Sequence, residues 1–204
     1  MQSPSTLGKE TDGEPPPALR RAGAGGCPHA VLFYRDDAAV FGKVAAYITS
    51  ALRSGAPALV IAKPRLIEHV TIDLHREHVD GTPFGPERGR LLALDAEATL
   101  ERACRNGSPD TARFERVIGE ALDVLETPGR NVTAYGEMVG ILCERGDFAA
   151  AVELEQMWGR LLARRQASLL CGYSQRLFSH SSTQGFYRDI RAAHDTVLGE
   201  EAAA

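Results

Sequence analysis

The stretch that most constrains the fold is Val132-Thr-Ala-Tyr-Gly-Glu-Met138, where a short strand pattern changes directly into a helix pattern. Residues 132–135 suit a buried strand, and Gly136 allows the chain to turn sharply. From Met138 onward the apolar residues recur at helical spacing. A strand that passes into a helix through Gly136 and Glu137 places a carboxylate at the carboxyl end of a parallel sheet. Ligands bind at that edge in open α/β sheets.

Other parts of the chain repeat this strand–helix unit. Apolar runs at 29–34, 58–62, 91–96 and 168–173 predict further strands, each followed by a segment with helical periodicity. The alternation, with no hairpin signal recognised, predicts an α/β fold with a mainly parallel sheet flanked by helices. The order of the strands cannot be derived from this pattern.

Several helix boundaries and one core residue also follow from local patterns. Ser108 and Pro109 have the residue types of a helix cap and first helical residue, and they predict a helix that starts there. The last helix is predicted over about residues 183–198, with Val197 facing inward. Trp158 shares one helical stripe with Leu154 and Leu161, which predicts a core position.

Composition divides the chain into one globular part and two short ends. Residues 1–28 contain Pro and Gly runs with few large apolar side chains, and they predict a disordered leader. Residues 29–199 have the length of a single domain, and residues 200–204 predict a disordered tail. The domain as a whole is expected to be one α/β unit.

The charge and the apolar content exclude some classes of partner. A net charge of −4, with no run of Lys or Arg, gives no general attraction for nucleic acid or for acidic membranes. No apolar stretch approaches the ~18 residues that a membrane span needs, and no signal peptide pattern is present. We therefore expect a cytoplasmic protein that binds neither membrane nor nucleic acid directly.

The four cysteines do not form a recognisable metal or redox motif. None belongs to a CxxC pair, so neither a zinc knuckle nor a thioredoxin motif is encoded. Cys104, Cys143 and Cys171 have apolar neighbours and are expected to behave as small buried hydrophobic residues. The sequence predicts no metal and no cofactor.

A phosphate-binding loop is absent from the position where a nucleotide-binding protein of this class needs one. The GxxxxGK[ST] pattern does not occur, and the glycine-rich run 23–26 precedes the first strand instead of following it. The first strand is followed by Arg35, Asp36 and Asp37, and two carboxylates at this turn would repel phosphate. No GxSxG or HExxH motif occurs either, so no catalytic residue is predicted and the chain is not expected to be an enzyme.

Polar and aromatic side chains at the predicted strand ends form a candidate small-molecule site. Tyr34, Asp36, Asp95, Glu137 and Tyr173 all follow or end predicted strands. Asp36 and Asp95, each taken alone, are better explained as helix caps. Glu137 is the strongest candidate, because a buried carboxylate is costly unless it is paired. The three carboxylates could together hold Mg²⁺, but no phosphate-binding part accompanies them.

Several segments resemble the MEDS family, a sensory domain named from methanogen and methylotroph proteins and the dichloromethane-responsive regulator. The matching segments, in order, are His29-Ala-Val-Leu-Phe-Tyr34 with Asp36, Leu94-Asp95-Ala96, Gly107-Ser-Pro-Asp110 with Phe114, Ala134-Tyr-Gly-Glu-Met-Val139, Leu154-Glu155 with Trp158, and Leu169-Leu-Cys-Gly-Tyr173. The resemblance covers about residues 29–198. It implies a RecA/KaiC-like core that has lost its phosphate loop and that senses small organic, hydrocarbon-like ligands.

The sequence departs from the family pattern at three places. Gly159 follows Trp158 where members often have Asn, Ser174 follows Tyr173 where they often have Pro, and Arg65 stands where a His is common. These differences concern the particular ligand more than the fold.

Together, the residues and the resemblance predict a non-catalytic sensory domain that binds a small, largely apolar organic ligand. Tyr34, Tyr135 and Tyr173 would form the walls of the site. The residues that would orient or gate the ligand are His29, Asp36 and Glu137.

The signal is expected to pass to a separate protein, a kinase or a transcription or anti-sigma regulator, and a homodimer is left open. Family members are often joined to a kinase or a DNA-binding module, and neither is recognised in this sequence. Two alternatives remain. One is a degenerate RecA-like nucleotide-binding protein that uses Glu137 and Asp36 on a metal. The other is a partner-switching interaction module with a vestigial pocket.

Overall fold

A computed structural model describes residues 29–79 and 90–199 of the chain. The predicted leader, the predicted tail and most of the loop between the second helix and the third strand lie outside these residues. Among the described helices, none combines the length and the apolar character that a membrane crossing requires.

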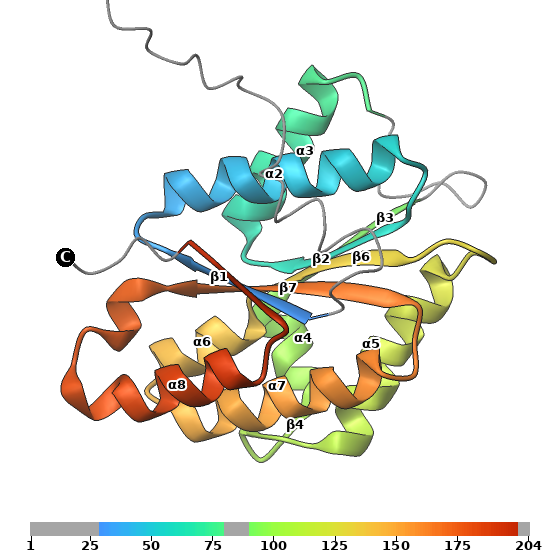
Figure 1. Ribbon diagram of the computed structural model, residues 1–204. Helices are drawn as coiled ribbons and strands as arrows, with labels where there is room; N and C mark the ends of the chain where they lie inside the picture. The colour runs from blue at the N-terminus through green and yellow to red at the C-terminus, as the bar shows by residue number, and fades with distance from the viewer. Residues whose placement is uncertain (1–28, 80–89, 200–204) are drawn as a thin grey trace, which may run out of the picture.

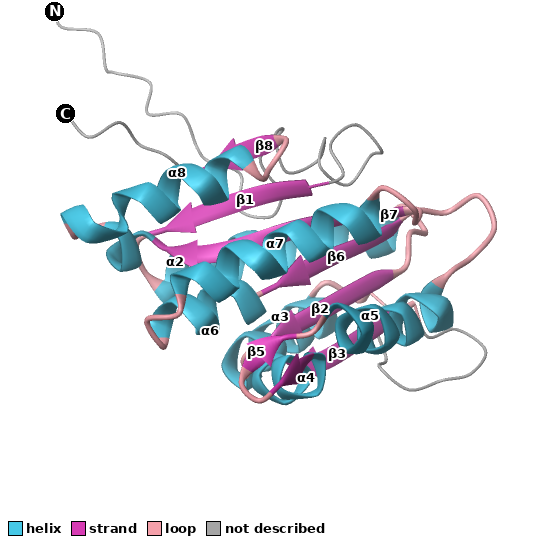
Figure 2. Ribbon diagram, turned by 90° about the horizontal axis from the view of Figure 1, so that it is seen from below, coloured by secondary structure: helices cyan, strands magenta, loops and turns pink. Residues whose placement is uncertain are grey.

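The structure is built around one six-stranded sheet in which all strands run parallel, in the order β3-β2-β6-β7-β1-β8. Figure 2 shows these strands side by side. The strands are β1 (His29–Tyr34), β2 (Ala58–Ala62), β3 (Leu91–Asp95), β6 (Val132–Gly136), β7 (Ala167–Ser174) and β8 (Thr196–Leu198). The predicted α/β class with a parallel sheet is therefore confirmed, and β1 and β2 have the predicted bounds.

Helices cover both faces of the sheet, but unequally (Figure 1). The first face is covered by α2 (Asp37–Arg53) and α3 (Pro64–Arg76). The second face is covered by α4 (Ala96–Ala103), α5 (Thr111–Leu125), α6 (Met138–Glu144), α7 (Phe148–Leu162) and α8 (Gln184–Ala192). Two short 3-10 helices, η1 (Gln175–Phe178) and η2 (Ser181–Thr183), join β7 to α8.

The strands are buried on both faces, and their side chains alternate between two separate hydrophobic cores. In β1, Val31 and Phe33 belong to the core under α4–α8, whereas Ala30 and Leu32 belong to the core under α2 and α3. This alternation decides which residues can share a binding site, because the sheet itself separates the two cores.

Aspartates begin three of the helices on the second face. Asp95, Asp110 and Asp147 each accept a backbone hydrogen bond from the third residue that follows, which satisfies an amide that the helix leaves free. The interpretation of Asp95 as a helix cap is confirmed: its Oδ1 lies 2.8 Å from the amide nitrogen of Ala98.

The predicted helix start at Ser108 and Pro109 is wrong. These residues form β5 (Ser108–Pro109), which pairs antiparallel with β4 (Cys104–Arg105) in a small hairpin. Asn106 and Gly107 make the turn with φ values of 52° and 85°, as expected for the Asn-Gly pair of a two-residue hairpin. The helix begins after Asp110 instead, because residues 104–109 pair as a hairpin before it.

The prediction of one long final helix over residues 183–198 is also wrong. Helix α8 ends at Ala192, and Val197 lies in the edge strand β8, which pairs with β1. The chain turns at His194 and Asp195, where the amide of Asp195 donates to the carbonyl of His29 at 2.8 Å. Pairing with β1 thus overrides the local helical pattern, which is a tertiary effect.

Trp158 is buried, as predicted, with 1% of its surface exposed, and it packs edge-on against Phe114 at 5.1 Å between ring centroids. We expect Trp158→Ala to lower the free energy of unfolding by ~3–5 kcal/mol, because it leaves a cavity in the core. The measurement is chemical denaturation at equilibrium. The matched control is Val124→Ala on α5, where the side chain is 74% exposed, and a change within ~0.5 kcal/mol is expected there. A loss below ~1 kcal/mol for Trp158→Ala would contradict the assignment.

Candidate functional site

Glu137 joins two strand ends at the carboxyl edge of the sheet. It follows β6, and its Oε2 accepts a hydrogen bond from the backbone amide of Lys63, directly after β2, at 2.7 Å. The hydroxyl of Tyr135 lies 3.3 Å from the other carboxylate oxygen. The buried carboxylate therefore has two donors in the protein, and it holds the turn after β2 against the turn after β6.

The environment of Glu137 favours its protonated form. Burial raises the pKa of this carboxyl above its ordinary value, and it outweighs the opposite effects of the Lys63 amide and the Lys63 ammonium. The folded protein therefore holds the Glu137 proton more tightly than an exposed carboxyl group would.

The pH dependence of Glu137→Gln tests this environment. The folded protein holds the Glu137 proton more tightly than the unfolded chain, where the pKa is near 4.5. Wild-type stability relative to Glu137→Gln is therefore expected to fall as the pH rises from about 4 through the raised pKa, and then to level off. Denaturation curves at several pH values measure the difference. A difference that stays constant or changes in the opposite sense would show that burial does not control this group.

Glu137→Ala serves as the companion variant. It removes the acceptor of the Lys63 amide, whereas the Gln carbonyl keeps it, so Ala is expected to cost ~1–3 kcal/mol more than Gln. Equal stabilities of the two variants would mean that the Lys63 contact contributes little.

The sheet divides the six predicted ligand-binding residues into separate groups. Tyr135 lies in the core under α2 and α3, and half-buried Tyr34 packs against that core. Tyr173 lies in the core on the opposite face, where it meets His29 at a shared partner, Glu155. The structure therefore brings Tyr135 and Glu137 together and brings His29 and Tyr173 together, but it does not combine both pairs in one cavity.

Asp36 lies at the exposed start of α2, where its backbone carbonyl accepts from the amide of Val40 at 3.4 Å. It is near the carboxyl edge, as expected from its place after β1. The assignment of all six residues as ligand contacts remains a prediction.

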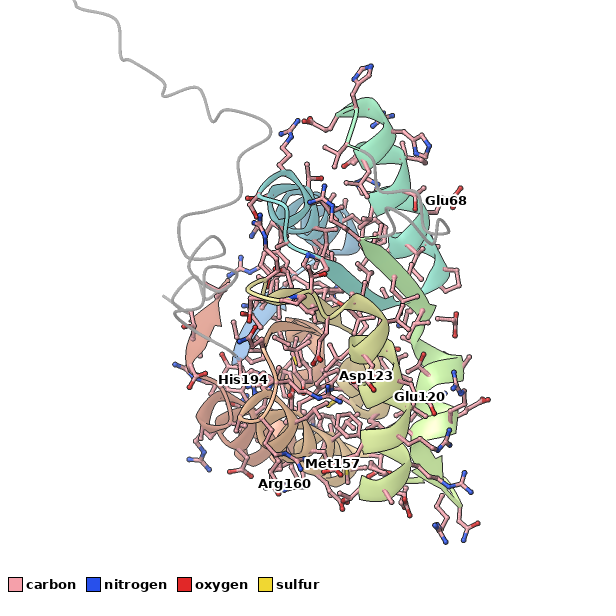
Figure 3. The ribbon with its side chains drawn as sticks, turned by 90° about the vertical axis from the view of Figure 1, so that its right-hand side faces the viewer. Glu68, Glu120, Asp123, Met157, Arg160 and His194 are labelled. Carbon is pink, nitrogen blue, oxygen red and sulfur yellow. The ribbon has the colours of Figure 1, made fainter. Side chains whose placement is uncertain are left out.

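The most concentrated group of polar side chains surrounds Glu155, which is fully buried in the middle of α7. We call Glu155, His29, Cys171, Tyr173 and His194 the Glu155 cluster. The Tyr173 hydroxyl donates to Oε1 at 2.6 Å and the Cys171 thiol to Oε2 at 3.3 Å. His29 Nε2 lies 3.0 Å from Oε2, and His194 Nε2 lies 3.4 Å from Oε1. His194 sits at the edge of the sheet, above α7 and α8 (Figure 3).

The electrostatics of the cluster are dominated by the carboxylate and the imidazoles. Burial by itself would raise the pKa of Glu155, but the adjacent His194 and His29 outweigh it and hold that pKa well below its usual range. Burial would likewise lower the pKa of His194, and the Glu155 carboxylate raises it instead. Burial raises the pKa of the Cys171 thiol and of the Tyr173 hydroxyl. The cluster is therefore built around a buried negative charge.

Three members of the cluster were not predicted from the sequence as site residues. Glu155 offered a signal, because it falls among the apolar positions of α7 between Leu154 and Trp158, where a charge must find partners. Cys171 was expected to be a buried hydrophobic residue. It is buried and free of disulfides, but its thiol also faces Glu155 and His29. His194 offered no local signal.

The cluster has the donor set of a metal centre. One ligand atom from each of His29, Glu155, Cys171 and His194 can be chosen so that all four lie within 4.8 Å of one another. Two imidazole nitrogens, a thiol sulfur and a carboxylate oxygen are the ligand types of transition-metal sites.

Aromatic rings surround the carboxyl ends of β1 and β7 on the same face of the sheet. Phe33 and Tyr173 are register partners in these strands, with ring centroids 5.9 Å apart. The group continues through Phe178 of η1 and Tyr187 of α8, which lie 5.8 Å and 4.8 Å from Phe33. We call Phe33, Tyr173, Phe178, Tyr187, Phe148 and Phe186 the aromatic cluster. Tyr173 belongs to both clusters and connects them.

A comparison with models of known protein families finds a match over most of the chain. The family model for the MEthanogen/methylotroph, DcmR Sensory domain, MEDS, matches residues 28–195. The chain belongs to the MEDS family. The resemblance noted in the sequence is thereby confirmed, and MEDS describes a sensory domain and is not a known enzyme family. No curated protein matches the chain. Both clusters of this MEDS domain lie within the matched residues.

The hydroxyl of Tyr173 is expected to stabilise the Glu155 cluster of the MEDS domain. Tyr173→Phe removes the donor at 2.6 Å from a buried carboxylate, and we expect a loss of ~1–3 kcal/mol in the free energy of unfolding. Tyr47→Phe is the matched control, because Tyr47 is buried and its hydroxyl has no hydrogen-bond partner. The control is expected to change stability by less than ~0.5 kcal/mol or to increase it. Equal losses in chemical denaturation would contradict the role given to Tyr173.

Proposed function

We propose that this MEDS domain senses a small, largely apolar organic molecule that binds in the aromatic cluster. The observation that supports this is the gathering of aromatic rings at the carboxyl ends of two neighbouring parallel strands, next to buried polar groups. Small-molecule sites combine an apolar lining with a few polar groups that fix orientation, and in α/β sheets they lie at this edge. The Tyr173 hydroxyl would be the polar group nearest to the ligand.

Helix α8, which covers the aromatic cluster, is suited to local opening. Helix α8 has one fully buried residue, Ile190, among its described side chains, and Tyr187 is only partly buried. An element with so few buried contacts opens locally at low free-energy cost. A ligand that inserts beside Tyr187 would shift η1 and α8, and this movement would reach His194 and the edge strand β8, which directly follow α8.

The response is proposed to pass to a separate regulatory protein, a kinase or a transcription or anti-sigma regulator, and the domain itself is proposed to be non-catalytic. The sensory character of the family supports this role. The degenerate RecA/KaiC-like origin is likewise a proposal, supported by the parallel sheet and by the absence of the phosphate-loop motif from the sequence.

Binding of small apolar probes tests the proposal. We would titrate the purified chain with dichloromethane, toluene and cyclohexanol, and follow binding by saturation-transfer NMR and amide chemical-shift changes. At least one probe is expected to bind and to shift the amides of η1 and α8. Tyr187→Ala should weaken that binding at least about tenfold, or about 1.4 kcal/mol. Native mass spectrometry of the untreated protein adds a search for a retained ligand.

Phe41→Ala is the matched control, because Phe41 is a partly buried aromatic residue on α2, over the opposite face of the sheet. It should change probe affinity by less than about twofold, roughly 0.4 kcal/mol. Shifts that instead centre on Tyr34, Tyr135 and Glu137 would move the site to the other face. Mg-ATP binding below about 100 μM, near −5.5 kcal/mol, would favour the degenerate nucleotide-binding alternative.

A further inference from the structure

We propose that His29, Glu155, Cys171 and His194 form a four-coordinate site for a transition-metal ion of the Zn²⁺ type. The four side chains come from β1, α7, β7 and the turn between α8 and β8. The proposal concerns the Glu155 cluster alone, and it does not depend on whether an organic ligand binds in the aromatic cluster.

The spacing of the four candidate ligand atoms agrees with tetrahedral coordination. Metal–ligand distances of about 2.0–2.3 Å place neighbouring ligand atoms about 3.3–3.8 Å apart in a tetrahedral site. Glu155 Oε2 lies 3.0 Å from His29 Nε2 and 3.3 Å from Cys171 Sγ, and the last two atoms are 3.5 Å apart. The Nε2 atom of His194 lies 3.4 Å from the other carboxylate oxygen. All four atoms lie within 4.8 Å of one another, so coordination requires the four side chains to converge on one ion.

The hydrogen bonding of His194 indicates that a cation lies between its ring and the Glu155 carboxylate. Its Nδ1 lies 2.6 Å from the carbonyl oxygen of Ile190, and a carbonyl only accepts, so Nδ1 carries a proton. Its buried Nε2 makes no hydrogen bond, even though Glu155 Oε1 is 3.4 Å away. A bare nitrogen lone pair would repel the carboxylate. Either a second proton on the imidazole or a metal ion between the two groups removes this repulsion.

Charge balance admits a divalent metal ion as well as a proton, and the set of ligand atoms favours the metal ion. A divalent ion with the Glu155 carboxylate, the Cys171 thiolate and two neutral imidazoles has no net charge, as a fully buried site requires. Nitrogen and sulfur ligands exclude Mg²⁺ and Ca²⁺, which prefer oxygen, and they select Zn²⁺ and its neighbours in the transition series.

Outer contacts hold two of the four ligands in place. The Ile190 carbonyl fixes the His194 ring with Nε2 directed inward, and the Tyr173 hydroxyl holds the Glu155 carboxylate at 2.6 Å. Such partners orient the ligands of established metal sites. All four positions are filled by protein atoms and the side chains are buried, so the site has the closed form of structural zinc. The metal would link the turn before β8 to β1, β7 and α7.

Cobalt substitution of the full-length chain tests the proposal. After treatment with a chelator, Co²⁺ would be titrated into the wild type while its absorption is recorded. We expect saturation at about one equivalent, with the visible bands of tetrahedral Co²⁺ and a thiolate-to-cobalt charge-transfer band. Zn²⁺ should displace the cobalt and raise the melting temperature, because the four ligands are brought together only in the folded state. Elemental analysis of the protein as purified measures the metal that it already holds.

Matched variants identify the ligands. Cys171→Ser should abolish the charge-transfer band, whereas Cys143→Ser, which replaces another buried cysteine outside the four ligands, should retain it. His194→Gln should weaken Co²⁺ binding more than about tenfold, and His180→Gln, at an exposed histidine, less than about threefold.

Three results would overturn the proposal. They are no saturable Co²⁺ binding by the folded wild type up to about 1 mM, binding without a thiolate band, and a band that survives Cys171→Ser. The wild-type titration decides the first two outcomes even if a variant fails to fold. In those cases the cation between His194 and Glu155 is a proton.

Discussion

A buried carboxylate with four polar partners organises the second face of this domain. Glu155 has no exposed surface, so its charge is tolerable only because His29, Cys171, Tyr173 and His194 approach it from β1, β7 and the turn before β8. Removing a partner would leave the charge uncompensated, whereas removing the charge would leave several polar groups without a partner. The interaction therefore ties α7, β1, β7 and the edge strand β8 into one arrangement.

The sheet contributes the second constraint by separating two cores that differ in composition. The core under α2 and α3 is mainly aliphatic, and Tyr135 enters it close to the backbone of β7. A Cβ atom at Gly172 would collide with the Tyr135 hydroxyl, which explains a glycine in the interior of a buried strand. On the opposite face, Phe33 contacts Tyr173, and Tyr173 connects the aromatic cluster with the Glu155 cluster. The two proposed sites, one for an apolar molecule and one for a metal ion, thus lie on the same face of the sheet.

The candidate site could be predicted only in part, and strand alternation explains the difference. His29 and Tyr34 lie five positions apart in the same strand, so they must point to opposite faces. Grouping residues by their position near strand ends ignored this alternation and combined side chains that the sheet separates. Glu155 could have been recognised, since a charged residue on an apolar helix stripe is costly without partners. His194 could not, because its role depends on a partner almost forty residues earlier in the chain.

Local patterns by themselves determined the strand and helix types, the parallel α/β class, the buried position of Trp158 and the membership in a sensory family. These features depend on the periodicity of neighbouring residues and on short sequence segments, which are written directly in the chain. Tertiary structure alone decided the strand order, the separation of Tyr135 from Tyr173, and the change from helix to edge strand after Ala192. It also decided the meeting of His29, Glu155, Cys171 and His194. Each of these depends on pairing between distant segments, where burial and backbone hydrogen bonds outweigh local preference.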